Sequence, residues 1–211
     1  MKQNPIPRRP STGCHKHVDI WSTFCHFVEM KTNFPDEKTQ ARQKQILVAA
    51  RWCFLNYGFA KTTFDDIAKR AALSRTLIYR VFKSKEDVFQ AVFVDWLLAR
   101  QPAAKEAAEG SGSPSERLLA VCRVLALEPW AEMAGTLKGG EYHEICKRVA
   151  PDSEERYRKF THECVCEVLG DASVAEVFLL ALNGLFADEP EPDVLERRII
   201  LLVSHFSRPT I

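Results

Sequence analysis

Side chains that can bind phosphates and the edges of bases gather between Ser74 and Lys85. The i, i+4 spacing places Ile78 and Phe82 on one apolar face of a predicted helix, Arg75–Phe82. The other face of this helix carries cationic and hydrogen-bonding groups: Arg75, Thr76, Tyr79, Arg80 and Lys83. Such a face suits contact with a polyanion, because it offers positive charge and hydrogen-bond donors together.

Three helix starts position these side chains. Thr63 precedes an apolar helical pattern and Asp66 follows three residues later, which is typical of a capping box. Ser74 and Ser84 are two further caps. We therefore predict two short helices joined by a tight turn and followed by a third helix, which is the helix-turn-helix arrangement. An ordinary helical hairpin in an all-α core is the alternative.

The formal net charge of +1 conceals a division of charge along the chain. Residues 38–85 contain 11 Lys and Arg against 2 Asp and Glu, which is a net charge of +9. Residues 86–211 contain 13 against 22, which is a net charge of −9. The cationic segment coincides with the predicted helix-turn-helix, and this is the electrostatic footprint of a surface that neutralises phosphates.

No pattern in the sequence indicates a catalytic or metal site. There is no phosphate-binding Gly loop, zincin motif or nucleophile elbow. The seven cysteines form neither a disulfide framework nor a paired C-x-x-C site, which favours a reducing, cytoplasmic setting. His162 and Cys166 share a helical face, but two ligands make a weak case for a metal. The residues Cys14, His15, His17, Cys25 and His26 match no structural zinc spacing. We expect no cofactor and no metal.

The chain divides into three predicted segments. Residues 1–37 are expected to be a disordered extension, and Met30 is a candidate translation start, which would make residues 1–29 optional. Residues 38–85 are the helix-turn-helix domain, which begins with an amphipathic helix over 39–57. Residues 86–211 are a second helical domain without a membrane-spanning stretch. The fold class is all-α.

Proline and glycine positions set the expected helix boundaries after residue 85. The helix that follows Ser84 should continue to about Arg100, where Pro102 weakens or ends it. Pro114 should begin another helix, whereas Pro129 and Gly135 should interrupt the region that follows. The remaining predicted helices cover 141–149, 153–169, 174–187 and 190–207.

The last two predicted helices have more apolar surface than a small subunit needs. Residues 174–187 are apolar nearly all round, so this helix must be buried on two sides. We predict that it forms a homodimer interface together with 190–207, and burial within one subunit is the alternative. The predicted interface residues are Phe178, Ala181, Leu182, Gly184, Leu185, Ile199, Leu202 and Phe206.

Residues 40–94 contain a long register of matched positions: Ala49-Ala50, Phe54, Tyr57-Gly58-Phe59, Thr62-Thr63, Asp66-Ile67-Ala68, Ala71, Ser74, Tyr79, Phe82 and Ser84-Lys85-Glu86. This register resembles the N-terminal DNA-binding domain of the tetracycline-repressor-like (TetR/AcrR) transcriptional regulators. Two positions depart from the family. Ala72 stands where members often have Gly, so it must hold its turn at negative φ or under strain. Val81 stands where they favour an aromatic residue or His.

The resemblance implies a dimeric regulator, expected to be a repressor that responds to a small molecule, with residues 86–211 as its helical regulatory and dimerisation domain. Its partners would be an operator in double-stranded DNA, a second copy of the chain and an unknown effector. Arg75, Thr76 and Leu77 would contact base edges in the major groove. Thr63, Tyr79 and Lys85 would hold phosphates. The predicted DNA-contacting set is completed by Ser74, Arg80 and Lys83.

An effector pocket would lie within residues 86–211. Its candidate lining residues are Trp96, Trp130, Met133, Phe160 and Phe178, although each also fits an ordinary core position. Two other functions compete with DNA binding. One is an all-α enzyme, and the absence of catalytic motifs argues against it. The other is an interaction protein that uses the helix-turn-helix only for packing, which would not need a net charge of +9.

Overall fold

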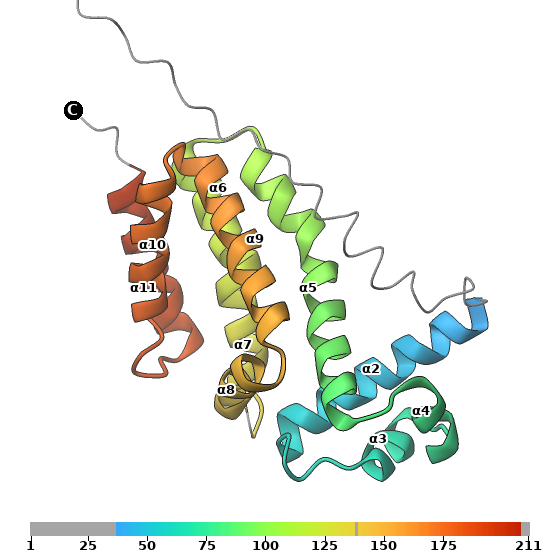
Figure 1. Ribbon diagram of the computed structural model, residues 1–211. Helices are drawn as coiled ribbons and strands as arrows, with labels where there is room; N and C mark the ends of the chain where they lie inside the picture. The colour runs from blue at the N-terminus through green and yellow to red at the C-terminus, as the bar shows by residue number, and fades with distance from the viewer. Residues whose placement is uncertain (1–36, 138, 208–211) are drawn as a thin grey trace, which may run out of the picture. The chain divides into compact units, whose positions relative to one another are not determined.

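The computed structural model describes residues 37–137 and 139–207, in which every regular element is a helix (Figure 1). The predicted extension up to residue 36 lies outside these residues, together with the candidate start and the early Cys and His positions. The helices are α2 (Glu37–Tyr57), α3 (Phe64–Ala71), α4 (Arg75–Val81), α5 (Lys85–Glu109), α6 (Pro114–Cys122), the π-helix η1 (Arg123–Leu127), α7 (Glu128–Ala134), α8 (Gly139–Val149), α9 (Pro151–Leu169), α10 (Ala172–Gly184) and α11 (Pro192–Phe206). Within the described ranges, none of them combines the length and apolar content needed to cross a bilayer.

Local capping begins the helices of the helix-turn-helix as predicted. The Thr63 side chain accepts from the Asp66 N–H, and the Asp66 carboxylate accepts from the Thr63 N–H, so the capping box of α3 is confirmed. The Ser74 hydroxyl caps α4 by accepting from Leu77 N–H at 3.3 Å. Ser84 forms a second capping box at the start of α5. These bonds satisfy N–H groups that a helix start leaves without intrahelical partners.

The turn between α3 and α4 forces Ala72 into the left-handed region. Its φ is 50° and its ψ is 39°. The Ala72 N–H donates to Lys69 O at 3.2 Å and the Leu73 N–H to Ala68 O at 3.0 Å, which is the bonding pattern of a Schellman motif. Glycine usually occupies this position, because a Cβ is unfavourable there. Of the two conformations that the sequence left open at Ala72, negative φ or a strained one, the turn therefore uses the strained one.

Pro102 does not end α5, and the expectation of a stop near Arg100 was wrong. The helix continues through Pro102 to Glu109. Alanines follow the proline, and alanine has the highest intrinsic helix propensity. Two of them, Ala104 and Ala108, are also buried in a hydrophobic core, so packing compensates for the missing N–H of the proline.

Pro129 does not break the chain either. The backbone stays helical from Pro114 to Ala134 by passing through the π-helix η1. Pro129 has no N–H for the carbonyl of Leu125, four residues earlier. The hydroxyl of Tyr157 in α9 donates a hydrogen bond to this carbonyl. A neighbouring helix therefore provides a donor to the carbonyl that Pro129, four residues later, cannot serve.

Two hydrophobic clusters build the compact unit that begins at Ala41. The first joins α2, α3 and α4 to α8 and to residues 88–93 of α5, so the core of the helix-turn-helix extends beyond residue 85. The second joins the later part of α5 to α6, η1, α9, α10 and α11. Trp96 and Tyr157 pack against both clusters, with ring centroids 5.9 Å apart. The long helix α5 therefore belongs to both cores (Figure 1).

Candidate nucleic-acid interface

Helix α4 presents most of the predicted DNA-contacting residues to solvent. Ile78 is fully buried, whereas Tyr79 is 50% exposed. The exposed members of the predicted set are Thr63, Ser74, Arg75, Thr76, Tyr79, Arg80 and Lys83, while Leu77 and Lys85 are half-buried. Phe82 is buried and caps the C-terminus of α4. The helix is therefore held by its apolar face and offers its polar face to a partner.

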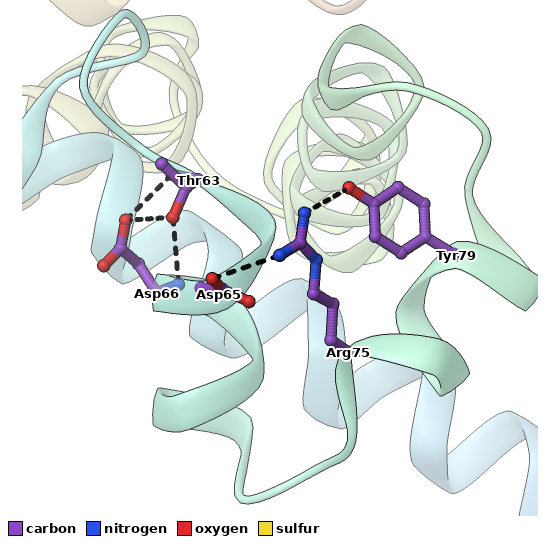
Figure 2. A network of polar contacts seen from close by, with 5 residues as sticks. All are labelled: Thr63, Asp65, Asp66, Arg75 and Tyr79. Atoms are coloured by element: carbon purple, nitrogen blue, oxygen red, sulfur yellow. Dashed lines mark hydrogen bonds and ion pairs between the residues drawn. The ribbon is translucent and has the colours of Figure 1, made fainter.

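Arg75 is held by two neighbours rather than projecting alone, as Figure 2 shows. Its Nη1 donates to Asp65 Oδ2 at 3.2 Å, and its Nη2 donates to the Tyr79 hydroxyl at 3.0 Å. The hydrogen bond to Tyr79 and then the charge of Asp65 raise the pKa of Arg75 above its ordinary value. The Tyr79 ring packs on Phe64 of α3, with centroids 4.6 Å apart. The start of α4 is thus joined to α3 by a polar and an aromatic contact.

Asp65 is a candidate functional residue that the sequence interpretation missed. Only two acidic residues occur between 38 and 85, and Asp66 is explained by the capping box. The second one, Asp65, had no assigned role in a strongly cationic segment. That unexplained carboxylate is the signal that could have identified it. Its partner could not be named, because the contact depends on the angle between α3 and α4.

The two predicted phosphate-holding residues at helix starts already have partners within the chain. The Thr63 hydroxyl donates to Asp66 Oδ2 at 2.6 Å, and the hydrogen bonds from Thr63 lower the pKa of Asp66. The Lys85 ammonium donates to Ala60 O at 3.2 Å and lies 4.6 Å from the centroid of the Phe59 ring. These contacts orient both side chains. In the described part of the chain, neither Arg80 nor Lys83 forms an ion pair.

Ion pairs connect α2 to helices of the second cluster. The Lys44 ammonium contacts both carboxylate oxygens of Asp95 in α5 at 2.8 Å. Glu132 of α7 binds Arg51 of α2 through one oxygen and Arg100 of α5 through the other. Burial acts to raise the pKa of Glu132, but the hydrogen bond from Arg51 and the two positive charges outweigh it, so the pKa is lowered. This carboxylate links α7 directly to α2.

The predicted effector-lining residues do not form one described pocket. Trp96, Trp130 and Met133 are half-buried, whereas Phe160 and Phe178 belong to the second cluster. A groove of about 830 Å³ lies instead at α2 and α3, with none of these side chains in its lining. It is lined by Ala41, Lys44, Gln45, Val48, Ala49, Tyr57, Asp66, Lys69, Arg70 and Ala71. The effector role of the five residues stays a prediction.

The other predicted ligand groups can also be placed. His162 Nε2 lies 3.3 Å from Ala172 O, and Cys166 is buried. Among the described residues, no group of three His, Cys, Asp or Glu side chains is arranged to hold a metal ion.

The apolar surface of α10 and α11 lies on a different face from the predicted one. Phe178, Leu182 and Ile199 are at most 5% exposed inside the subunit, so they are buried without a second copy, and their assignment to an interface stays a prediction. Phe178 and Leu182 are core residues because this face of α10 packs on α9 and α11, and Ile199 of α11 belongs to the same cluster. Of the other predicted interface residues, Gly184 is exposed and four are half-buried: Ala181, Leu185, Leu202 and Phe206. The exposed large apolar side chains here are Val174, Val177, Leu180, Ile200 and Leu201, which we call the α10–α11 apolar face.

Sequence comparison identifies relatives of the helix-turn-helix part. Residues 46–92 match the family model described as bacterial regulatory proteins, tetR family. The uncharacterized HTH-type transcriptional regulator YhgD of Bacillus subtilis is 40% identical over 70 residues, 33% of this chain and 37% of that protein. The HTH-type transcriptional repressor Rv1474c of Mycobacterium tuberculosis is 33% identical over 94 residues, 44% of this chain and 46% of that protein. The chain thus matches less than half the length of these relatives.

Structural comparison extends the likeness to most of the chain. A TetR-like transcriptional regulator from Rhodococcus sp. RHA1 superposes with a TM-score of 0.60 at 23% identity, covering 78% of this chain and 94% of that one. The TetR-like transcriptional regulator LfrR from Mycobacterium smegmatis, solved in complex with proflavine, superposes with a TM-score of 0.53 at 19% identity. That match covers 82% of this chain and 99% of LfrR. At these identities the likeness concerns the fold, and it confirms the predicted all-α class.

Proposed function

We propose that this chain, which belongs to the tetR family of bacterial regulatory proteins, binds operator sequences in double-stranded DNA as a homodimer and represses transcription. The proposal assigns DNA binding to residues 38–85 and regulation with dimerisation to residues 86–211. The observation that carries it is the polar face of α4, which is exposed while Ile78 anchors the helix in the core. This face lies in the segment with a net charge of +9.

Base contacts are assigned to the N-terminal half of α4. Arg75, Thr76 and Leu77 occupy its first turn, and the N-terminal residues of a recognition helix are those that contact base edges. Arginine can donate to O6 and N7 of guanine, and the methyl groups of Thr and Leu can pack on a thymine methyl. The cap residue Ser74 and the later Arg80 would lie closer to the sugar-phosphate backbone.

Phosphate contacts are assigned to the starts of α3 and α5 and to the end of α4. Thr63 precedes α3, and Lys85 is the first residue of α5, where the helix N-terminus favours a bound anion. Tyr79 and Lys83 lie between these two sites along the chain and are exposed. Such contacts fix the position of the protein on the duplex without selecting a sequence.

Dimerisation is assigned to the α10–α11 apolar face. Leu180 is 66% exposed and Leu201 is 62% exposed, and neither exposure is explained within one subunit. A second copy of the same face would cover them in a two-fold arrangement. Two recognition helices related by this axis would then contact two half-sites separated by one helical turn of DNA or a multiple of it.

Regulation is assigned to a small molecule that acts near Trp96 and α7. The similar protein LfrR was solved with proflavine bound, which supports an aromatic ligand as one class to try. Trp96 packs between the two clusters, and the guanidinium carbon of Arg100 lies 4.4 Å from its ring centroid. Arg100 shares Glu132 with Arg51 of α2. A ligand that moves Trp96 would therefore disturb the ion pairs of Glu132 that lead to α2. If the ligand binds one position of Trp96 more tightly than the other, it shifts the populations of the two conformations.

The test is the salt dependence of binding to duplex DNA drawn from the host genome. We expect the affinity of the full chain to fall steeply with salt, and the double variant Tyr79→Ala with Lys85→Ala to bind weakly. Loss of the Lys85 contact alone should make the negative slope of log K against log salt shallower by about 0.9. Lys159→Ala is the matched control, because it removes the same charge from an exposed position of α9.

Two results would refute the proposal. The first is no binding to any duplex at low salt. The second is a loss of affinity in Lys159→Ala as large as that in the double variant, since binding would then depend on total charge rather than on α4 and its surroundings.

A further inference from the structure

We infer that Asp65 determines specificity by making Arg75 selective for guanine. This inference rests on the function proposed above and names the base that the same surface selects. Asp65 lies in the first turn of α3 and Arg75 is the first residue of α4, so their ion pair joins the two helices of the helix-turn-helix (Figure 2).

The two contacts of Arg75 orient its guanidinium before DNA is bound. Nη1 donates to Asp65 at 3.2 Å and Nη2 to Tyr79 at 3.0 Å. A guanidinium has five N–H donors, so three stay available, and the major-groove edge of guanine takes two at O6 and N7. An arginine side chain at a helix start would otherwise lose many conformations on binding. Asp65 and Tyr79 reduce this cost while leaving enough donors for bidentate contact.

The carboxylate of Asp65 also makes the wrong base pairs unfavourable. In a G·C pair, cytosine presents its N4 amino donor to the major groove, which a nearby carboxylate tolerates. In a pair with thymine, the O4 acceptor would face the carboxylate instead, and two acceptors repel. The same negative charge offsets the attraction of Arg75 to phosphates, a contact that carries no sequence information. Asp65 therefore lowers the affinity for DNA of any sequence and increases the preference for guanine over the other bases.

A purely local role for Asp65 makes a different prediction. Negative side chains in the first turn stabilise a helix through its dipole, and both Asp65 and Asp66 lie there. A local role would change stability and leave base preference intact. Glu86 provides the matched comparison, because it occupies the first turn of α5 and the described partners of Arg75 are Asp65 and Tyr79. Glu86→Ala removes an equal charge from the start of α5, the next helix along the chain.

The experiment is selection of bound duplexes from a random double-stranded DNA library at one fixed salt concentration. The full chain is compared with Arg75→Ala, Asp65→Ala, Asp65→Asn and Glu86→Ala. Arg75→Ala identifies the base pair that Arg75 contacts in each half-site. Competition binding then measures the preference of every variant among all four base pairs at that position. Thermal unfolding checks each fold, and Asp65→Asn, which keeps the shape of the side chain, replaces Asp65→Ala if the latter does not fold.

We expect the wild-type chain to prefer G·C at this position by about 5- to 150-fold. Both Asp65 variants should lose most of that preference and should bind random duplex DNA as tightly as the wild type or more tightly. Glu86→Ala should keep the preference. The inference is overturned if the Asp65 variants discriminate as the wild type does, or if Arg75→Ala changes no base preference. If the wild-type chain selects no duplex at all, the proposed function fails first and the inference fails with it.

Discussion

Replacing Ala72 by Gly should stabilise the protein, although glycine is usually the less stabilising residue. Ala72 has a φ of 50° in the turn before α4, and a residue with a Cβ loses about 1–2 kcal/mol in this region relative to the right-handed one. Glycine adds conformational entropy to the unfolded chain, which costs about 0.4–1 kcal/mol. Ala72 is exposed, so losing its methyl group removes little packing. The net gain should be about 0.5–1 kcal/mol.

Urea and thermal unfolding of Ala72→Gly measure this gain. The midpoint temperature should rise by about 1–4 °C for a chain of this size. Gly170→Ala provides the mirror experiment, because Gly170 has a φ of 72° and an added Cβ would meet nothing within 4 Å. It should destabilise by a similar amount. Gly135→Ala is the control at a negative φ of −77° and should not destabilise. A lower stability of Ala72→Gly than of the wild type would refute this reasoning, because the entropy that glycine adds to the unfolded chain would then outweigh the relief of strain at Ala72.

Three further predictions concern residues 86–211. Tyr157→Phe should lower the free energy of unfolding by about 1–3 kcal/mol, because it removes the donor to the carbonyl of Leu125. The loss should be smaller in a Pro129→Ala background, where the alanine supplies an N–H. An equal loss in both backgrounds would contradict this account. Burial acts to raise the pKa of Glu132 in the folded state, but the two arginines lower it below the value of an unfolded chain. The ion pairs of Glu132 therefore stabilise the fold fully above the unfolded pKa of about 4.3. This contribution is lost as the pH falls through the lower folded pKa. Glu132→Gln should therefore cost about 1 kcal/mol in urea unfolding at neutral pH and nothing in strong acid, and a pH-independent difference would count against the ion pairs. Leu180→Asp should convert the proposed dimer to a monomer in sedimentation equilibrium. Val48→Asp, similarly exposed on α2, should leave the mass unchanged. An unaltered mass for both would exclude the α10–α11 apolar face as the interface.

The sequence by itself determined the helix-turn-helix, because the signals for it are local. Thr63, Ser74 and Ser84 each bond to N–H groups within four residues, so a cap can be recognised without knowledge of the rest of the fold. The apolar spacing of Ile78 and Phe82 likewise fixes which face of α4 is buried. Charge division along the chain then separated the cationic segment from the acidic remainder.

Only the tertiary structure decided which residues meet across elements. The contact of Asp65 with Arg75 depends on the angle between α3 and α4. The left-handed conformation of Ala72, which is unusual for alanine, sets this angle. The apolar helix α10 showed in its sequence that it must be buried, but not which face turns inward. Phe178 became core because α9 and α11 cover that face. Composition gives the amount of apolar surface, whereas its direction follows from packing against distant helices.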